Sequence, residues 1–163
     1  MTPPTSGVAQ IAHGVADPDA AGARWVERHG AGPFVVNHHI ELVDVVHRGE
    51  PATLDHSSAY GRWGNVMVEL IQVHDAEPAG LLELVRTDRA DVHHVAVFAD
   101  DLDAAATHHE ALGHREVVRA STSHGVRFAW FDARHELGHL VEVYERHELL
   151  TGFYSRLGIT VPV

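Results

Sequence analysis

A stretch near the N-terminus of the chain recurs 84 positions further on. Residues 10–30 read QIAHGVADPDAAGARWVERHG and residues 94–113 read HVAVFADDLDAAATHHEALG, so that Gln10 stands opposite His94. Aspartate stands opposite aspartate at two later positions, and an alanine pair follows the second of them in both copies. Such self-similarity indicates one supersecondary unit used twice. The chain therefore has to fold as two similar modules.

Each copy starts with an alternating strand and continues with a helix. Asp17 and Asp101 stand at the helix N-cap, and a glycine stop follows the helix in both copies. Alternating runs rich in β-branched residues then predict three more strands in each module. These strands are expected at 34–46, 52–63 and 65–73 in the first copy, and at 115–122, 125–133 and 139–145 in the second. The predicted fold class is α+β, with two βαβββ modules in tandem.

Segments outside these strands and helices complete the predicted organisation. The first module is expected within residues 1–75 and the second within 92–146. Residues 76–91 combine turn residues with one short helical pattern, which is typical of a linker. Residues 147–163 carry leucine and phenylalanine at helical spacing, and this predicts a C-terminal helix and tail that dock on the body.

The composition limits the partners of the chain. Its 163 residues include 23 acidic and 12 basic ones, and the net charge of −11 argues against nucleic acid or an anionic membrane as the partner. The absence of cysteine excludes disulfides, thiolate zinc sites and thiol catalysis. The sequence shows no signal peptide and no run apolar enough to span a membrane. We expect a cytoplasmic protein that binds a small molecule.

Residues 135–139, HELGH, match the HExxH pattern of zinc metalloproteases. That pattern needs a helix through both histidines, because only then do they face one ion. Gly138 disfavours a helix here, and the run LVEVY directly after His139 alternates as a strand does. A third ligand at the spacing of the common protease arrangements is also missing. We therefore interpret HELGH as a turn that enters a strand.

Four polar residues occupy equivalent strand positions in the two copies. Gln10 and His94 lie in the first strands, and Glu69 and Glu142 lie in the last ones. Taken singly, each is most often a solvated or hydrogen-bonded residue. Both glutamates, however, share a strand face with apolar neighbours, where a carboxylate is costly unless it is paired or binds a cation. A pseudo-twofold axis would bring the four side chains together.

These features resemble the vicinal oxygen chelate superfamily, which includes glyoxalase I, methylmalonyl-CoA epimerase and bleomycin-resistance proteins. The resemblance covers about residues 8–145 and rests on VHHVAVFADDLDAA and SHGVRFAWFDARHELGHLVEVYE, with weaker support from GNVMVELIQ. The second module is most similar to methylmalonyl-CoA epimerase. The resemblance implies that both modules form a cupped mixed sheet around a central metal or ligand site.

The resemblance also implies the ligands of that site. The metal-binding positions of the superfamily fall on Gln10, Glu69, His94 and Glu142, a set that is one of the patterns found in glyoxalase I. They would hold one divalent metal ion per chain. Its oxygen-rich ligands suit Zn, Ni, Co, Mn or Mg.

Candidate catalytic bases follow from the same resemblance. Glu142 can act as both ligand and base in glyoxalase-like sites, and Glu50 lies roughly where the epimerase carries a catalytic glutamate. His39 is the third candidate, because it shares a strand face with Glu41 and one of these two side chains can face the cup. His56 and His124 are further histidines that could take this role.

Two classes of function are compatible with such a cup. The leading hypothesis is a metal-dependent enzyme that chelates a carbonyl or enolate substrate and transfers a proton, as an epimerase, isomerase or glyoxalase-type lyase. The alternative is a metal-free protein that binds a small molecule such as an antibiotic, as bleomycin-resistance proteins do. A homodimer is a common arrangement in such families.

Overall fold

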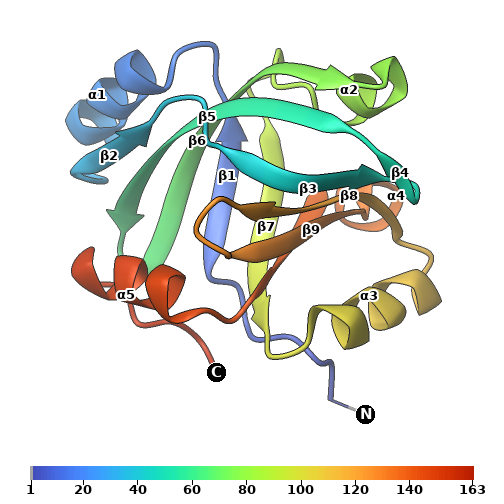
Figure 1. Ribbon diagram of the computed structural model, residues 1–163. Coiled ribbons are helices and arrows are strands. Elements are labelled where there is room, and N and C mark those ends of the chain that lie inside the picture. Colours follow the sequence, from blue (N-terminus) through green and yellow to red (C-terminus); the bar gives the residue numbers. More distant parts are fainter. Residues whose placement is uncertain (1) are drawn as a thin grey trace.

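The computed structural model describes residues 2–163, in which two similar series of strands and helices follow each other (Figure 1). The first series holds β1 (Gln10–Gly14), α1 (Pro18–His29), β2 (Phe34–Asn37), β3 (Leu42–His47), β4 (Glu50–Pro51), β5 (Thr53–Trp63) and β6 (Val66–Glu77), followed by α2 (Ala79–Val85). The second holds β7 (Val92–Ala99), α3 (Leu102–Ala111), β8 (Arg115–Thr122), β9 (Arg127–Asp132), α4 (Arg134–Leu137) and β10 (Leu140–Glu145), followed by α5 (Glu148–Arg156). The predicted α+β class is confirmed. Residue 1, where the expected first module begins, lies outside the described part, and the module boundaries stay a prediction.

The helices α1 and α3 begin at the aspartates that the repeat singled out. The side chain of Asp17 accepts a hydrogen bond from the backbone N–H of Ala20, and that of Asp101 accepts from two backbone N–H groups in the first turn of α3. Helix α1 ends at Gly30, which adopts the left-handed conformation that glycine tolerates without strain. Local sequence signals therefore place both helices.

The ten strands form one mixed sheet in the order β2-β5-β6-β1-β7-β10-β9-β8-β3-β4. Strands β1 and β7, the first of each copy, pair antiparallel at the centre. Each then pairs in parallel with the last strand of its own copy, β1 with β6 and β7 with β10. The four strands that carry the predicted ligands are therefore consecutive in the sheet.

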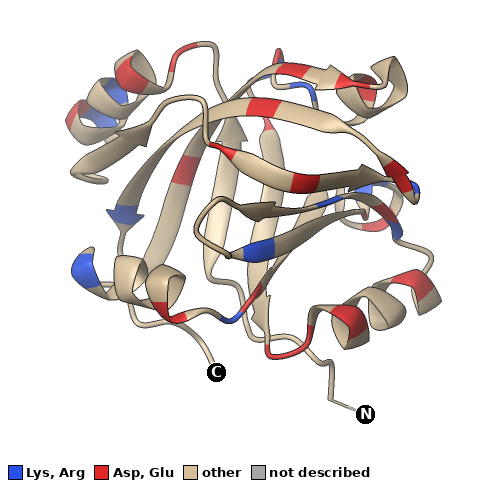
Figure 2. Ribbon diagram, viewed as in Figure 1, with Lys and Arg blue, Asp and Glu red and all other residues tan. Residues whose placement is uncertain are grey.

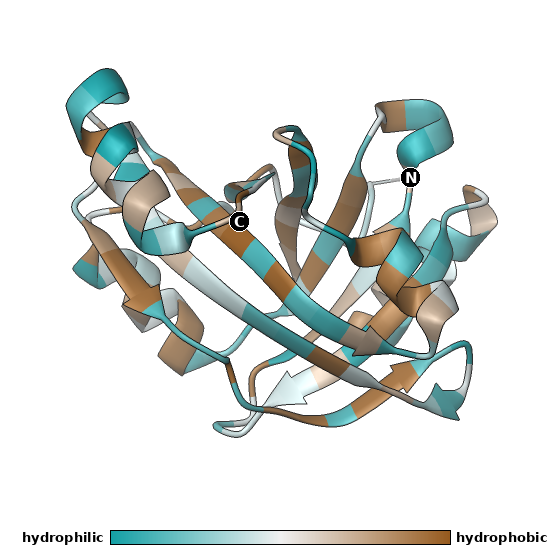
Figure 3. Ribbon diagram, turned by 90° about the horizontal axis from the view of Figure 1, so that it is seen from above, coloured by the Kyte–Doolittle hydropathy of each residue, from teal (hydrophilic) through white to brown (hydrophobic). Residues whose placement is uncertain are grey.

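The sheet curls into a cup (Figures 1 and 3). Strands β2 and β3 are joined by residues 38–41 alone, yet they stand near opposite ends of the sheet order. So short a connection can join them only when the sheet bends until its two ends approach each other. The cupped mixed sheet expected from the sequence is confirmed.

Three hydrophobic clusters fill the two sides of the sheet. The outer side is covered twice, where Ala21 of α1 packs on β5 and β6, and where Leu102 of α3 packs on β9 and β10. The third hydrophobic cluster fills the cup and includes Phe98, Trp130 and, from helix α5, Tyr154. Helix α5 docks on the cup mouth because its apolar side chains are buried against this third cluster.

The strand expected at residues 34–46 is wrong in one respect, because the structure divides it into β2 and β3. Strand β2 pairs with β5, whereas β3 pairs with β8 of the second copy. Between them His39 has a φ of 46°, in the left-handed region. Histidine is among the few residues that adopt this conformation. The break is therefore not marked by a glycine or proline in the sequence.

The HELGH segment also differs in detail from the expected turn. Residues 134–137 form the single-turn helix α4, which ends where Gly138 adopts a φ of 82°. His139 lies beyond that helix, and its Nδ1 is 2.8 Å from the carbonyl oxygen of Leu140. Because His135 and His139 do not share a helix, they do not present the two imidazoles of a metalloprotease.

The packing of Phe34 predicts a specific cost for Gly61→Ala. A Cβ at position 61 would lie 2.7 Å from atoms of the Phe34 ring, so the ring or the strand has to shift. We expect urea unfolding to show a loss of about 1–3 kcal/mol. Gly80→Ala is the control, because a Cβ there meets no atom within 4 Å and alanine favours a helix. Equal stability of the two variants would contradict this account of the packing.

Candidate metal centre

Strand register brings the four predicted ligands together in two short rows. Across β6, β1 and β7, Ala12 stands between Glu69 and His94. Across β1, β7 and β10, Ala96 stands between Gln10 and Glu142. The two alanines are equivalent in the repeat, and both are fully buried. Their small side chains leave space at the centre of the cup, towards which the four larger ones extend.

The four polar groups lie in direct contact. His94 Nε2 is 3.1 Å from Oε2 of Glu69 and 2.9 Å from Oε2 of Glu142. The Gln10 amide donates to Glu69 at 2.6 Å and lies 3.4 Å from Oε2 of Glu142. None of the four side chains is more than 3% exposed. The structure thus brings every predicted ligand into one buried cluster, which we call the inner cluster.

Hydrogen-bond donors outside the inner cluster reach the Oε1 atoms of its two glutamates and its glutamine. The Ser58 hydroxyl donates to Oε1 of Glu69 at 2.6 Å, and the Trp130 indole N–H donates to Oε1 of Glu142 at 2.9 Å. The Tyr154 hydroxyl donates to Oε1 of Gln10 at 2.9 Å. Both carboxylates therefore accept hydrogen bonds at each oxygen, which offsets part of the cost of burying them.

His93 sets the proton position on the His94 ring. His93 Nε2 lies 2.8 Å from the carbonyl oxygen of Val85, which can only accept, so this nitrogen carries the proton. Burial and the charge of His94 lower the pKa of His93 to about 3, and its Nδ1 is therefore a lone pair that faces Nδ1 of His94 at 2.8 Å. His94 donates from Nδ1 and directs Nε2 at the two glutamates. Metal-binding histidines are commonly oriented by such an outer hydrogen bond.

The charges of the inner cluster are strongly coupled. Burial acts to lower the pKa of His94, but the charges and hydrogen bonds of Glu142 and Glu69 outweigh it and raise that pKa to about 10. Burial acts to raise the pKa of Glu69, and the hydrogen bond and charge of His94 outweigh it so that this pKa is lowered. At neutral pH the cluster thus holds an imidazolium between two carboxylates, with one net negative charge.

The donor set fits a divalent metal ion. One ligand atom from each of Glu69, His94 and Glu142 lies within 4.8 Å of the others. A divalent ion in place of the proton on His94 Nε2 would bring the cluster from one negative charge to neutrality, which is favourable in a buried site. Gln10 would join as a ligand after its amide turns to present Oε1, and its NH₂ would then donate to the Tyr154 oxygen.

A small cavity leads from the cup mouth to the inner cluster. It measures about 160 Å³ and, of the four ligands, only Gln10 lines it. The phenols of Tyr60, Tyr144 and Tyr154 also line it, and burial raises the pKa of each, so they stay neutral. The cavity shares lining residues with an outer hollow of about 500 Å³ beside α5.

The structure places the other candidate bases apart from the inner cluster or at its edge. His39 and His124 line the outer hollow, and Nδ1 of His39 lies 2.8 Å from Oδ1 of Asp55. Glu50 is exposed and lines a different hollow beside β4. His56 is 5% exposed and its Nδ1 has no hydrogen-bond partner among the described residues. Burial, opposed by the charge of Glu69, lowers the pKa of His56, so its ring is neutral.

Sequence reasoning missed the residues that support the inner cluster. Ser58 and Trp130 lie on β5 and β9, on the strand faces turned into the cup, and Tyr154 lies on α5. The alternation of β5 and β9 is a signal that could have found the first two, because it turns their side chains to the sheet face that carries Glu69 and Glu142. Tyr154 depends on how α5 docks, for which the sequence holds no comparable signal.

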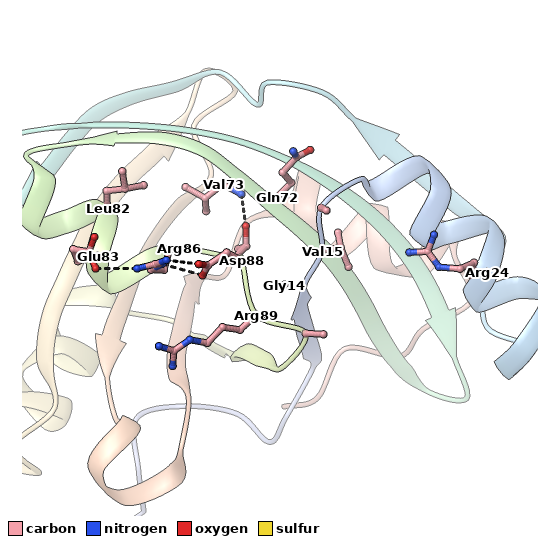
Figure 4. A pocket seen from close by; sticks show the side chains of 13 residues that line it. Gly14, Val15, Arg24, Gln72, Val73, Leu82, Glu83, Arg86, Asp88 and Arg89 are labelled. Carbon is pink, nitrogen blue, oxygen red and sulfur yellow. Dashed lines mark hydrogen bonds and ion pairs between the residues drawn. The ribbon is translucent and has the colours of Figure 1, made fainter.

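A further hollow, of about 640 Å³, lies beside the start of α1 and the segment after α2 (Figure 4). None of the four ligands lines it. Its Arg86 is paired with both Glu83 and Asp88. Elsewhere charged residues are spread over strands, helices and loops (Figure 2). Within residues 2–163, the helices are too short or too polar to cross a membrane.

Comparison with known proteins assigns the chain to a superfamily. The sequence pattern of the Glyoxalase/Bleomycin resistance protein/Dioxygenase superfamily matches residues 9–133. The chain belongs to this superfamily, as its sequence resemblance predicted. A search of curated protein sequences finds no match.

Solved structures share the fold at low sequence identity. Methylmalonyl-CoA epimerase from Mycobacterium tuberculosis is 18% identical, with a TM-score of 0.57 over 93% of this chain and 95% of that one. A hypothetical protein from Bacillus halodurans is 14% identical, with a TM-score of 0.58 over 88% and 96%. Streptomyces coelicolor methylmalonyl-CoA epimerase in complex with 2-nitronate-propionyl-CoA is 16% identical, with a TM-score of 0.53 over 86% and 94%. At these identities the likeness shows the fold.

The raised pKa of His94 predicts that the metal-free protein loses stability in mild alkali. Its folded pKa of about 10, against 6.5, contributes stability that is complete below pH 6.5 and is lost as pH rises towards 10. Urea unfolding between about pH 7.5 and 9.5 should show the free energy of unfolding falling by about 1.4 kcal/mol per pH unit. His94→Gln should remove this slope. A slope that persists in the variant would show that another group causes it.

Proposed function

We propose that this protein is a divalent-metal-dependent enzyme that transfers a proton at the carbon next to a carbonyl group of a small molecule. The reaction would be that of an epimerase, an isomerase or a glyoxalase-type lyase. The observation that carries the proposal is the inner cluster itself, in which Glu69 and Glu142 flank His94 and retain one excess negative charge. A metal-free binding protein has no need of two buried carboxylates at the end of its cavity.

Gln10, Glu69, His94 and Glu142 would hold the ion. A divalent ion bound there supplies Lewis-acid stabilisation of the negative charge that develops on a carbonyl oxygen. Gln10 is the only neutral oxygen ligand of the set, and it is also the residue that a molecule in the 160 Å³ cavity meets first. We infer that a substrate oxygen competes with the Gln10 amide for its place in the cluster.

Glu142 is the base that this proposal favours. Its Oε1 is held by the Trp130 indole at 2.9 Å, which fixes the direction in which Oε2 faces the centre of the cup. Glu69 is its equivalent in the repeat and approaches from the other side of the pseudo-twofold axis. Two carboxylates on opposite sides of one carbon can remove a proton from one face and return it to the other, as epimerisation requires.

The remaining candidates have other roles in this proposal. The neutral Tyr60, Tyr144 and Tyr154 exclude water from the inner cavity and offer hydroxyl groups to substrate oxygens. His39 and His124, at the outer hollow, would contact the distal part of a substrate. His56, whose buried Nδ1 lacks a partner among the described residues, can relay a proton to the Glu69 side. Glu50 has no role in the proposed reaction. The homodimer stays a prediction.

Proton exchange tests the reaction class. The metal-loaded protein would be incubated in heavy water with acyl-CoA thioesters, and separately with a glutathione hemithioacetal, and α-proton loss and product formation followed by NMR. We expect exchange or turnover in one series, reduced at least about 10²-fold by Glu142→Gln. Glu77→Gln, which removes an exposed carboxylate from the same strand as Glu69, is the control and should keep full activity.

Two results would overturn the proposal. One is a protein that binds the ion in the inner cluster but exchanges no proton in either series. The other is tight binding of a small molecule by a protein without affinity for divalent metals, which would establish the metal-free binding function instead.

A further inference from the structure

We propose a second divalent-metal site on the outside of the cup, formed by His114, His135 and Glu136. Its chemistry is that of two imidazoles and one carboxylate, which suits a transition-metal ion such as Zn²⁺, Co²⁺ or Ni²⁺. We call this set the outer cluster. It shares no residue with the inner cluster and does not depend on the function proposed above.

Pairing of β8 with β9 brings the outer cluster together. Arg115, the first residue of β8, pairs with Asp132, the last residue of β9. His114 directly precedes β8, and α4, which carries His135 and Glu136, begins two residues after Asp132. The turn after α3 and the single-turn helix α4 therefore lie side by side at one edge of the strand pair.

The geometry of the outer cluster is that of convergent ligands. Nε2 of His114 lies 2.8 Å from Oε2 of Glu136. One ligand atom from each of the three residues lies within 4.8 Å of the other two. The rings of His114 and His135 are 5.6 Å apart between centroids and inclined by 69°. Rings at such an angle can direct their in-plane lone pairs at one point between them.

A hydrogen bond to His109 inside the protein holds the ring of His114 in place. Its side chain is only 3% exposed, although its partner Glu136 is 57% exposed. Nδ1 of His114 lies 3.2 Å from Nδ1 of His109, which is itself buried and stacked on Phe131 at 4.5 Å. One ring nitrogen of His114 is thus fixed inside the protein while the other faces the surface carboxylate. This outer hydrogen bond is the arrangement that orients metal-binding histidines.

Another surface cluster lacks this convergent arrangement of its histidine rings. His39, Asp55 and His74 also place ligand atoms within 4.8 Å of one another. However, the His39 and His74 rings are stacked, with centroids 4.4 Å apart and planes inclined by only 24°. Stacked rings direct their in-plane lone pairs along separate planes, so both cannot reach one ion without rearrangement. The outer cluster needs no such change.

The site leaves coordination positions open to solvent. His135 lines a surface hollow of about 450 Å³ together with Gly113 and Arg115. The nearby Arg134 is neutralised by Asp132 at 2.7 Å, so it does not repel an ion. With three protein ligands, water or a small anion would complete the coordination. An ion there would tie α4 to the turn after α3.

Metal counting with separate removal of the two clusters tests the proposal. The wild-type protein, stripped of metal and dialysed against Zn²⁺, should bind two ions per chain. His135→Asn combined with Glu136→Gln should bind one, as should Glu69→Gln combined with Glu142→Gln. His139→Asn, the control for the other histidine of HELGH, should bind two.

NMR of histidine-labelled wild-type protein decides the outcome without relying on the folding of any variant. Titration with Zn²⁺ should shift the imidazole signals of His114 and His135 in one binding step and that of His94 in another. Unchanged His114 and His135 signals, or the same ion count in the outer-cluster variant as in the wild type, would overturn the outer site. A shift of His114 and His135 without one of His94 would uphold it and contradict the inner site alone.

Discussion

Two carboxylates buried side by side impose the condition that the rest of the structure has to meet. Glu69 and Glu142 are 2% and 3% exposed, and an ionised carboxylate buried without a partner costs several kcal/mol. Donors on β5, β9 and β1 reach their oxygens, and the proton on His94 supplies one positive charge. One negative charge is left over, and a divalent ion that takes the place of the proton on His94 Nε2 would remove it.

The central pairing of β1 with β7 makes this convergence possible. It joins the two copies about a pseudo-twofold axis, so that one glutamate arrives from each side. Ala12 and Ala96, which are equivalent in the repeat, keep the centre free of bulky side chains. Because one fold supports many chemistries, membership of the superfamily alone does not define a reaction. The assignment of function therefore rests on the cluster and its cavity.

Sequence reasoning predicted the parts of this structure that repeat. The 84-residue offset, the N-cap aspartates and the alternation in the last strands placed Gln10, His94 and the two glutamates correctly relative to one another. The break at His39 was missed because alternation continues across it and histidine tolerates a positive φ. Ser58 and Trp130 were missed although the alternation of β5 and β9 turns both into the cup, whereas Tyr154 depends on how α5 docks, which no local pattern encodes.

The position of a bound ion is the most direct test of the central claim. Crystals of the protein grown with Co²⁺ or Zn²⁺ would be measured on both sides of the absorption edge of that metal. The account predicts an anomalous-difference peak inside the cup, within bonding distance of Glu69, His94 and Glu142. Its absence at saturating metal, with His94 still bonded directly to both glutamates, would contradict it.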